Sequence, residues 1–202
     1  MPPNISELVE GIRRLEQELE AELAKKRAEL RFSIENRKIR FEQEVLLQHK
    51  KLKIGLASYL LHVPLRHLVS VPFIYSVFFA LLLLDLAVTL YQGICFPLYG
   101  IPRVKRRDFM IYDHNHLAYL NGIEKINCRY CSYASGLASY TKEIVARTEQ
   151  YWCPIKHAQR INQAHSRYSR FMDFGDGEGY RRELENLRCD FSTVEEKKEE
   201  GK

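Results

Sequence analysis

The sequence predicts an all-α membrane protein: a long N-terminal coiled-coil helix, a single transmembrane helix and a small helical Cys/His domain. Charged helix formers fill the first fifty residues, an apolar run occupies the middle, and cysteines recur in the last third. Although 46% of the 202 residues are hydrophobic and 28% are charged, the two kinds are segregated into blocks. The predicted parts are a coiled-coil helix (1–50), an interfacial amphipathic segment (51–69), a transmembrane helix (70–97), a Cys/His domain (98–175) and a charged, partly disordered tail (176–202).

The first block has the spacing of a coiled-coil seam. Apolar residues recur three and four positions apart, as in Ile5, Leu8, Ile12, Leu15 and Leu19, and then drift toward an eleven-residue repeat. Neither Gly nor Pro interrupts residues 12–54. A helix of about 45 residues would be roughly 67 Å long, too long to be buried in a small domain. Its apolar stripe therefore predicts a homo-oligomer or a hetero-complex.

The second block is long enough to cross a bilayer. Residues 71–96 are almost entirely apolar, and the hydrocarbon core needs about 20 residues of helix. Pro72 suits the first turn of that helix, while Gly93 and Pro97 suit its end. We expect membrane lipid as a partner and the bacterial inner membrane as the location.

Asp85 is the membrane-embedded polar residue of this run. A carboxylate at the bilayer centre costs about 2.5–3.5 kcal/mol on insertion scales, which the surrounding Leu and Phe can offset. We expect it to make an interhelical hydrogen bond in an oligomer or complex. The alternative is a proton- or ion-handling carboxylate in an accessory subunit of a channel or transporter.

Basic residues flank the run on both sides and suit anionic headgroups. The predicted membrane-surface set is Lys50, Lys51, Lys53, Arg103, Lys105, Arg106 and Arg107. The cluster after the run favours a cytoplasmic C-terminal domain, as do unpaired thiols. A re-entrant hairpin that keeps both halves inside is the second interpretation.

The last third contains a possible four-ligand motif. Cys128 and Cys131 form a C-x2-C pair, and Cys153 and His157 follow after twenty-one residues as C-x3-H. Pro154 suits a first helical position, which makes Cys153 a helix cap whose thiolate the N-terminal N–H groups favour. Residues four apart on a helix share a face, so His157 could join the same ion. A turn at C-x2-C would point the first two thiolates at that ion. Between the two pairs, a helix is predicted over about 135–150, with one stripe formed by Leu137, Tyr140, Ile144 and Tyr151. The pattern predicts a structural Cys3His zinc site; an iron–sulfur cluster is the alternative.

Neighbouring motifs receive simpler interpretations. Asp113–His116 is expected to cap a helix rather than to bind a metal, and His165 is expected at the surface. The Gly-rich run 175–179 is interpreted as a helix-ending turn, and residues 192–202 are predicted to be disordered.

The run from Tyr130 to Ala158, YCSYASGLASYTKEIVARTEQYWCPIKHA, resembles a group of uncharacterised bacterial membrane proteins. The cysteine motifs are its most specific part. The resemblance covers the second half of the chain and implies no activity.

These patterns predict a membrane-anchored interaction or scaffold protein that oligomerises or docks a partner through its coiled coil. Since no nucleophile elbow, P-loop or dinucleotide fingerprint is present, no catalytic residue is proposed. A net charge of +5 without a basic face gives no reason to expect nucleic acid. The alternative is an iron–sulfur or metal-dependent electron-transfer subunit of a membrane complex.

Overall fold

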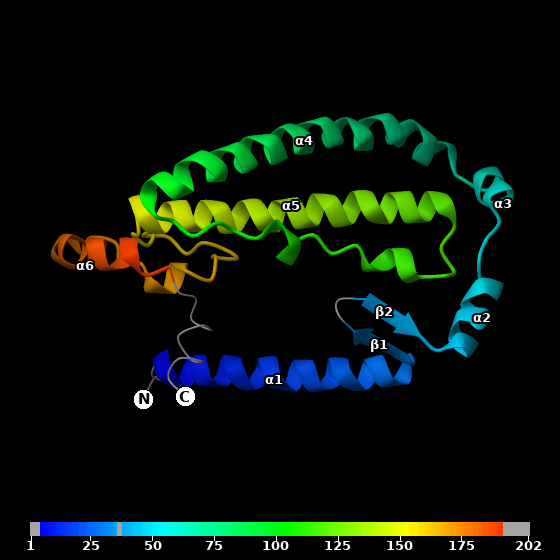
Figure 1. Cartoon of the computed structure of the whole chain (residues 1–202), viewed down its shortest axis with the longest axis horizontal. Coiled ribbons are helices and arrows are strands. Elements are labelled where there is room, and N and C mark those ends of the chain that lie inside the picture. Colours follow the sequence, from blue (N-terminus) through cyan, green and yellow to red (C-terminus); the bar gives the residue numbers. More distant parts are fainter. Residues whose placement is uncertain (1–4, 36–37, 192–202) are drawn as a thin grey trace. The chain divides into compact units, whose positions relative to one another are not determined.

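The computed structural model describes residues 5–35 and 38–191, and these are mostly helical (Figure 1). The α-helices are α1 (Ile5–Glu29), α2 (Gln43–Lys51), α3 (Leu56–Leu61), α4 (Leu65–Tyr99), α5 (Gly122–Trp152) and α6 (Gly177–Cys189). Strands β1 (Phe32–Glu35) and β2 (Lys38–Phe41) form a hairpin, and three 3-10 turns, η1 (Arg106–Asp108), η2 (Asp113–His116) and η3 (Tyr168–Arg170), lie in the connections. The predicted disorder of 192–202 falls outside the described residues.

The chain divides into two compact units. The first comprises Met1–Val63 and Tyr112–Arg129, and the second comprises Pro64–Ile111 and Tyr130–Lys202. The predicted five-part division therefore differs from the packing, because segments from both halves of the sequence contribute to each unit.

In the first unit, the predicted 45-residue helix is wrong beyond Glu29. Arg31 takes a left-handed backbone conformation (φ 51°), and an antiparallel hairpin follows. Phe32 pairs with Phe41 and Ile34 with Ile39, so apolar residues alternate at the two-residue period of a strand. That local alternation, FSIE and KIRF, outweighs the helix-forming composition around it.

Helix α4 is longer than the predicted span and begins earlier. Pro64 precedes it in an extended conformation, and Pro72 lies inside the helix rather than at its start. Gly100 ends the helix with φ 70°, and the N–H of Ile101 closes the turn onto the Phe96 carbonyl at 2.9 Å. Among the described residues, α4 is the one helix long and apolar enough to cross a membrane.

Helix α5 is one continuous helix where the sequence suggested a C-x2-C turn followed by a shorter helix. Asn121 and Glu124 form a capping box at its start: the Glu124 N–H donates to the Asn121 side chain at 3.0 Å, and the Asn121 N–H donates to Glu124 at 2.8 Å. The helix then runs to Trp152. Cys128 and Cys131 are therefore helical residues.

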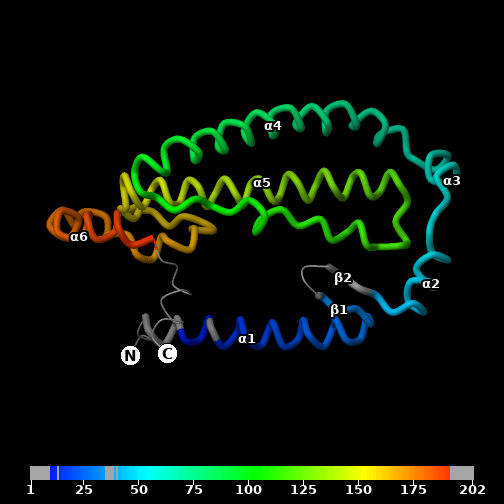
Figure 2. Tube along the Cα trace, viewed as in Figure 1, coloured from blue at the N-terminus to red at the C-terminus, as the bar shows by residue number. Residues whose placement is uncertain are grey.

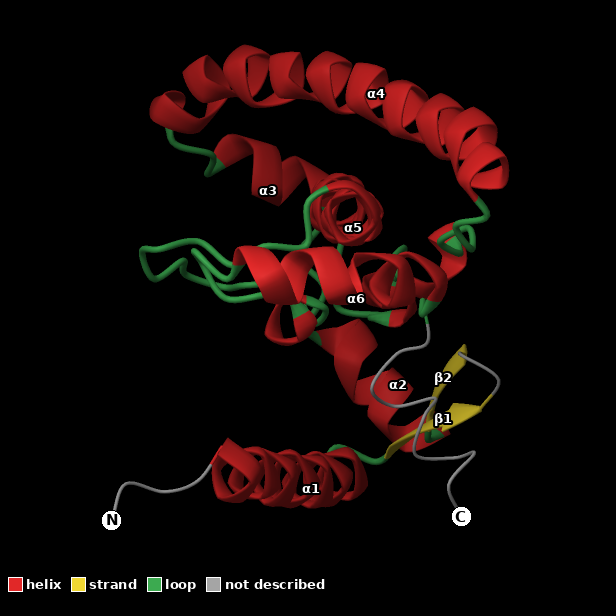
Figure 3. Ribbon diagram, turned by 90° about the vertical axis from the view of Figure 1, so that its left-hand side faces the viewer, coloured by secondary structure: helices red, strands yellow, loops and turns green. Residues whose placement is uncertain are grey.

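In the second unit, α4 and α5 run side by side in the same direction (Figures 1 and 2). Tyr75 contacts Tyr130 near one end and Tyr99 contacts Tyr151 near the other, with ring centroids 5.5 and 5.2 Å apart. Figure 3 looks along α5, with α4 on one side of it and α6 on the other. The core between these elements consists of Phe96, Ile101, Val104, Leu137, Tyr140, Ile144 and Phe191.

Two neighbouring helices that run in the same direction need a connection that leads back along them. Residues 100–111, here called the return segment, form the first part of that connection. Gly136 of α5 makes room for this segment, since a Cβ there would lie 2.7 Å from the Phe109 carbonyl oxygen and 2.9 Å from the Met110 sulfur. The buried stripe predicted on α5, which includes Leu137, Tyr140 and Ile144, is found in the core.

The start of α6 corrects the interpretation of the Gly-rich run. Asp176 caps α6, accepting a hydrogen bond from the Gly179 N–H at 2.8 Å. The run therefore begins a helix instead of ending one, because Asp is a favoured N-cap residue.

Candidate functional site

The α4 helix has two contrasting faces. Its inward face is a stripe at spacings of three and four, formed by Tyr75, Phe78, Leu81, Asp85, Val88, Gln92 and Phe96, with Tyr91 also on this face. Such spacing is typical of helices that pack side by side over several turns. Asp85, Tyr91 and Gln92 hydrogen-bond through their side chains to α5 or to the return segment, and all three lie on this stripe.

Asp85 lies on this inward face and is paired within its own chain. It is bound by the guanidinium of Arg106, with Nη2 to Oδ2 at 2.6 Å, and by the hydroxyl of Tyr133, which donates at 2.8 Å. Its side chain is 13% exposed. The interhelical hydrogen bond of Asp85 is thus made to α5 of its own chain, and the ion pair with Arg106 is an addition that the sequence did not indicate. The bond expected in an oligomer or complex stays a prediction.

A second polar contact on the stripe fixes the return segment. Gln92 is buried; its side-chain oxygen accepts from the Val104 N–H at 2.7 Å, and its Nε2 donates to the Tyr140 hydroxyl. The Gln92 amide thus joins α4, the return segment and α5. It also gives the buried N–H of Val104 a hydrogen-bond acceptor.

The outward face of α4 is apolar and exposed. The 18-residue apolar window of α4 is only 6% buried, which differs from a core helix of a soluble protein. The exposed large apolar residues of α4 are Leu65, Leu68, Val69, Val71, Phe73, Ile74, Val77, Phe79, Leu82, Leu83, Leu84, Leu86, Leu90, Ile94, Leu98 and Tyr99. An apolar surface of this extent marks an interaction site with a membrane or another protein.

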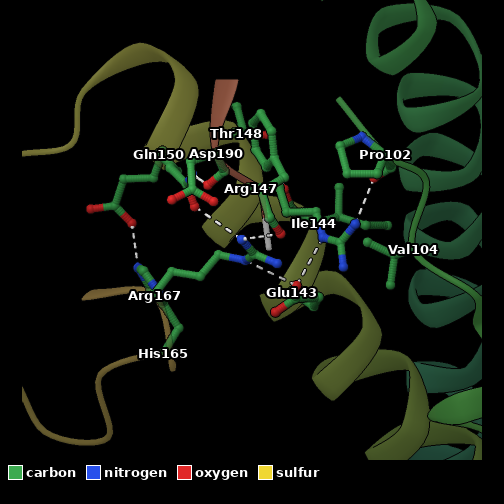
Figure 4. Close-up of polar contacts among 12 residues, drawn as sticks. Pro102, Val104, Glu143, Ile144, Arg147, Thr148, Gln150, His165, Arg167 and Asp190 are labelled. Carbon is green, nitrogen blue, oxygen red and sulfur yellow. Dashed lines mark hydrogen bonds and ion pairs between the residues drawn. The ribbon is translucent and has the colours of Figure 1, made fainter. Parts of the chain in front are cut away.

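A buried polar network joins the end of α5 to the C-terminal segments (Figure 4). Arg167 is 3% exposed and donates to Glu143 at 3.2 Å, to the Gln150 side chain at 3.0 Å and to the Phe191 carbonyl at 3.2 Å. Gln150 in turn donates to the carbonyls of Leu187 and Asp190, both at 2.7 Å. Burial lowers the pKa of Arg167, and the carboxylate of Glu143 opposes that shift.

This network holds the C-terminal segments against α5. Arg147 extends it by donating to Glu143 at 2.8 Å and to the Pro102 carbonyl at 2.6 Å. His165, expected at the surface, is instead largely buried and contacts Glu149 at 3.0 Å. Nε and Nη1 of Arg167 are matched to acceptors, which makes a buried arginine tolerable, whereas its Nη2 is buried without a hydrogen-bond partner among the described residues.

The structure does not bring the four predicted metal ligands together. Cys131 lies within α5 and Cys153 follows its last residue, twenty-two positions later, which corresponds to about 33 Å of helix. Within residues 5–35 and 38–191, no group of three or more His, Cys, Asp or Glu side chains is placed to hold a metal ion. Binding of zinc or of an iron–sulfur cluster stays a prediction.

The predicted helix start at Cys153 is wrong in position. Cys153 lies at the C-terminal end of α5, where its N–H donates to the Glu149 carbonyl at 2.8 Å. The next residues are not helical: Ile155 pairs with Met172, and the ring of His157 stacks on Tyr168. The i, i+4 argument for His157 therefore does not apply.

The electrostatics at Cys153 are also opposite to the expectation. Burial raises the pKa of the Cys153 thiol, and the nearby Glu149 carboxylate raises it further. A helix C-terminus carries partial negative charge, so it disfavours a thiolate that an N-terminus would favour.

The predicted membrane-surface residues fall in two places. Lys50 and Lys51 end α2, and Lys53 follows it, all exposed. Arg103, Lys105 and Arg107 are exposed on the return segment, whereas Arg106 contacts Asp85.

The Asp113–His116 run forms η2 rather than the cap of a long helix. His114 lies 3.0 Å from Asp113. Both line a pocket of about 330 Å³ in the first unit, with Phe32, Phe41 and Tyr119 among its apolar walls.

Sequence reasoning missed Tyr133, Gln92 and Arg167. The available signal was the spacing of Tyr130, Tyr133, Leu137 and Tyr140 along α5, which continues the stripe that was recognised. For Arg167, in a loop, the sequence offers no comparable pattern.

Comparison with known proteins adds no relative: no protein-family model, curated protein or solved structure matches this chain.

Proposed function

We propose that this protein is a membrane-anchored interaction protein, bound to the bilayer through α4 and joined to a partner helix through α1. The observation that carries the proposal is the division of α4 into an inward stripe with Asp85 and Gln92 and a predominantly apolar outward face. Lipid tails accept such a face, because its exposed side chains are mostly apolar and the Ser76 hydroxyl donates to the Phe73 carbonyl at 2.7 Å.

The interaction half of the proposal rests on α1. Ile12, Leu15, Leu19 and Leu23 lie on one stripe and are exposed, Leu15 and Leu19 to 60% each. Charged pairs such as Arg14–Glu18 and Lys25–Glu22 lie beside it. A solvent-exposed helix with one apolar seam and charged flanks is typical of coiled-coil partners.

Vesicle flotation of the purified full chain tests the anchor. Phe79 and Leu83 are 75% and 69% exposed on the outward face, and the double variant Phe79→Glu/Leu83→Glu should no longer float. Losing about 1.5–3 kcal/mol of burial per side chain weakens partitioning by roughly a hundredfold or more.

Val145→Glu is the matched control. Val145 is also exposed, at 54%, but lies on α5. This variant should float like the native protein. Failure of the native chain to float, or equal loss in the control, would contradict the anchor.

A further inference from the structure

The return segment runs back along α4 instead of leaving it. Arg103 donates to the Gly93 carbonyl at 2.9 Å, and the Val104 N–H donates to Gln92 at 2.7 Å. As the residue number rises from 103 to 104, the partner on α4 moves from 93 to 92. The segment therefore lies antiparallel beside the helix that precedes it.

The same segment reaches the middle of α4. Arg106 pairs with Asp85, which is fourteen residues before Tyr99 and so about 21 Å from that end of the helix. Lys105 and Arg107 are exposed beside this pair. Charged side chains and irregular backbone thus lie level with the centre of the apolar helix.

Helix α5 lies on this same inward side. Tyr130 donates to the Ile74 carbonyl at 2.9 Å, and Tyr91 and Thr148 hydroxyls lie 3.0 Å apart, so contacts extend over much of both helices. The exposed side chains of α5 include the charged Lys142 as well as the apolar Val145.

This arrangement argues against a transmembrane orientation, in which the axis of α4 would run along the bilayer normal. Irregular backbone facing lipid does not occur within the hydrocarbon region, because its polar groups find no partners there. Exposed Lys105 and Arg107 at that depth would be equally unfavourable. If α4 lies parallel to the membrane surface, both conflicts disappear. Its apolar outward face then points toward the acyl chains, and its inward face with the return segment points toward water.

We infer that α4 lies in the plane of the membrane interface, with its outward face among the acyl chains and the return segment and α5 on the water side. The inference rests on the proposed membrane anchor and specifies how that anchor works. The partner is a bilayer surface rich in anionic headgroups, which suits the basic return segment and the net charge of +5. Both ends of α4 then face the same side of the membrane.

Depth measurements along α4 test this orientation. Single cysteines are placed on the outward face at Val69, Phe79, Leu86 and Leu98, with the native cysteines replaced by serine. Each carries an environment-sensitive fluorophore, and the full chain is bound to phosphatidylcholine–phosphatidylglycerol vesicles whose lipids are brominated at shallow or deep positions. Val145→Cys is the control and should not be quenched.

An in-plane helix gives the same depth at all four positions, about 5–10 Å into the interface, so shallow bromines quench best throughout. A profile that is shallow at 69 and 98 and about 15 Å deep at 79 and 86 would overturn the inference and favour a spanning or re-entrant α4 while leaving the anchor intact. Absence of quenching everywhere, with no flotation, would overturn the anchor as well.

Oriented circular dichroism of the unsubstituted chain in stacked bilayers gives a second measurement that needs no cysteine replacement. Because α4 and α5 are parallel and long, their shared tilt dominates the signal. The spectrum of helices lying in the bilayer plane is expected, and that of helices along the bilayer normal would contradict the inference.

Discussion

At the scale of single residues, position along a helix decides the chemistry of Cys153. The thiol follows the C-terminal end of α5 and lies near Glu149, and both circumstances disfavour the thiolate. A cysteine followed by proline carries no information about which end of a helix it occupies. The placement of Cys153 changed its expected pKa from lowered to raised.

Alkylation kinetics check this shift. Because only the thiolate reacts and the pKa of Cys153 is raised, its reaction with iodoacetamide at pH 8 should be slowed, and Glu149→Gln should speed it. A surface charge contributes about 0.2–1 kcal/mol, so the gain should be roughly 1.5- to fivefold, read by peptide mass spectrometry. The gain should shrink at higher pH as both thiols ionise.

Glu178→Gln, which removes a carboxylate from the start of α6, is the control for that experiment and should leave the Cys153 rate unchanged. An unchanged or lower rate in Glu149→Gln would contradict the assignment of the pKa shift to that carboxylate.

Asp85 illustrates what residue-level prediction can and cannot reach. Its cost in an apolar run is visible in the sequence and predicts a polar partner. Its actual partners, Arg106 and Tyr133, come from a loop and from another helix, 21 and 48 positions away. Only the direction of the return segment, a tertiary property, brings them to the carboxylate.

At the scale of elements, periodicity identified the apolar faces but not every boundary. The α1 seam and the α5 stripe were recognised from spacings of three and four, and the long apolar helix from its composition. The hairpin after α1 was missed because its signal is short: apolar residues alternate with polar ones over only eight strand residues. The helix-forming residues around them dominated the prediction. The capping box at Asn121 and Glu124 was also readable and would have placed the start of α5.

Self-association through α1 is the prediction at this scale. Leu15→Ser/Leu19→Ser should convert an oligomer to a monomer in sedimentation velocity of the detergent-solubilised chain, because each buried leucine contributes about 1.5–3 kcal/mol. Gln17→Ser/Ala21→Ser changes the opposite side of the same helix and should leave the mass unaltered. A native chain that is monomeric, or a control that dissociates equally, would argue against self-association.

At the scale of the whole molecule, topology decides which sequence motifs can cooperate. Because α5 is continuous from Gly122 to Trp152, the helix itself sets the distance between the two cysteine pairs. Sequence spacing typical of metal ligands cannot bring them closer. The two cysteine pairs were joined in the prediction by assuming a turn at C-x2-C and a helix start at Cys153. Neither is present, and the same continuity lets α5 support α4 along its length.

The last prediction follows from that separation. Cys131 and Cys153 are separated by about 33 Å of one helix and cannot ligate a single ion. Cys131→Ser and Cys153→Ser should therefore each leave the free energy of unfolding within about 1 kcal/mol of the native value. A shared structural zinc would instead contribute about 10–16 kcal/mol, and losing one ligand would unfold the domain. Urea denaturation of the solubilised chain, with and without chelator, separates these outcomes, and metal analysis of the same preparation accompanies it. One zinc per chain with both variants unfolded, or a brown preparation that bleaches in both, would mean that α5 breaks between its cysteines and that the Cys3His site exists after all.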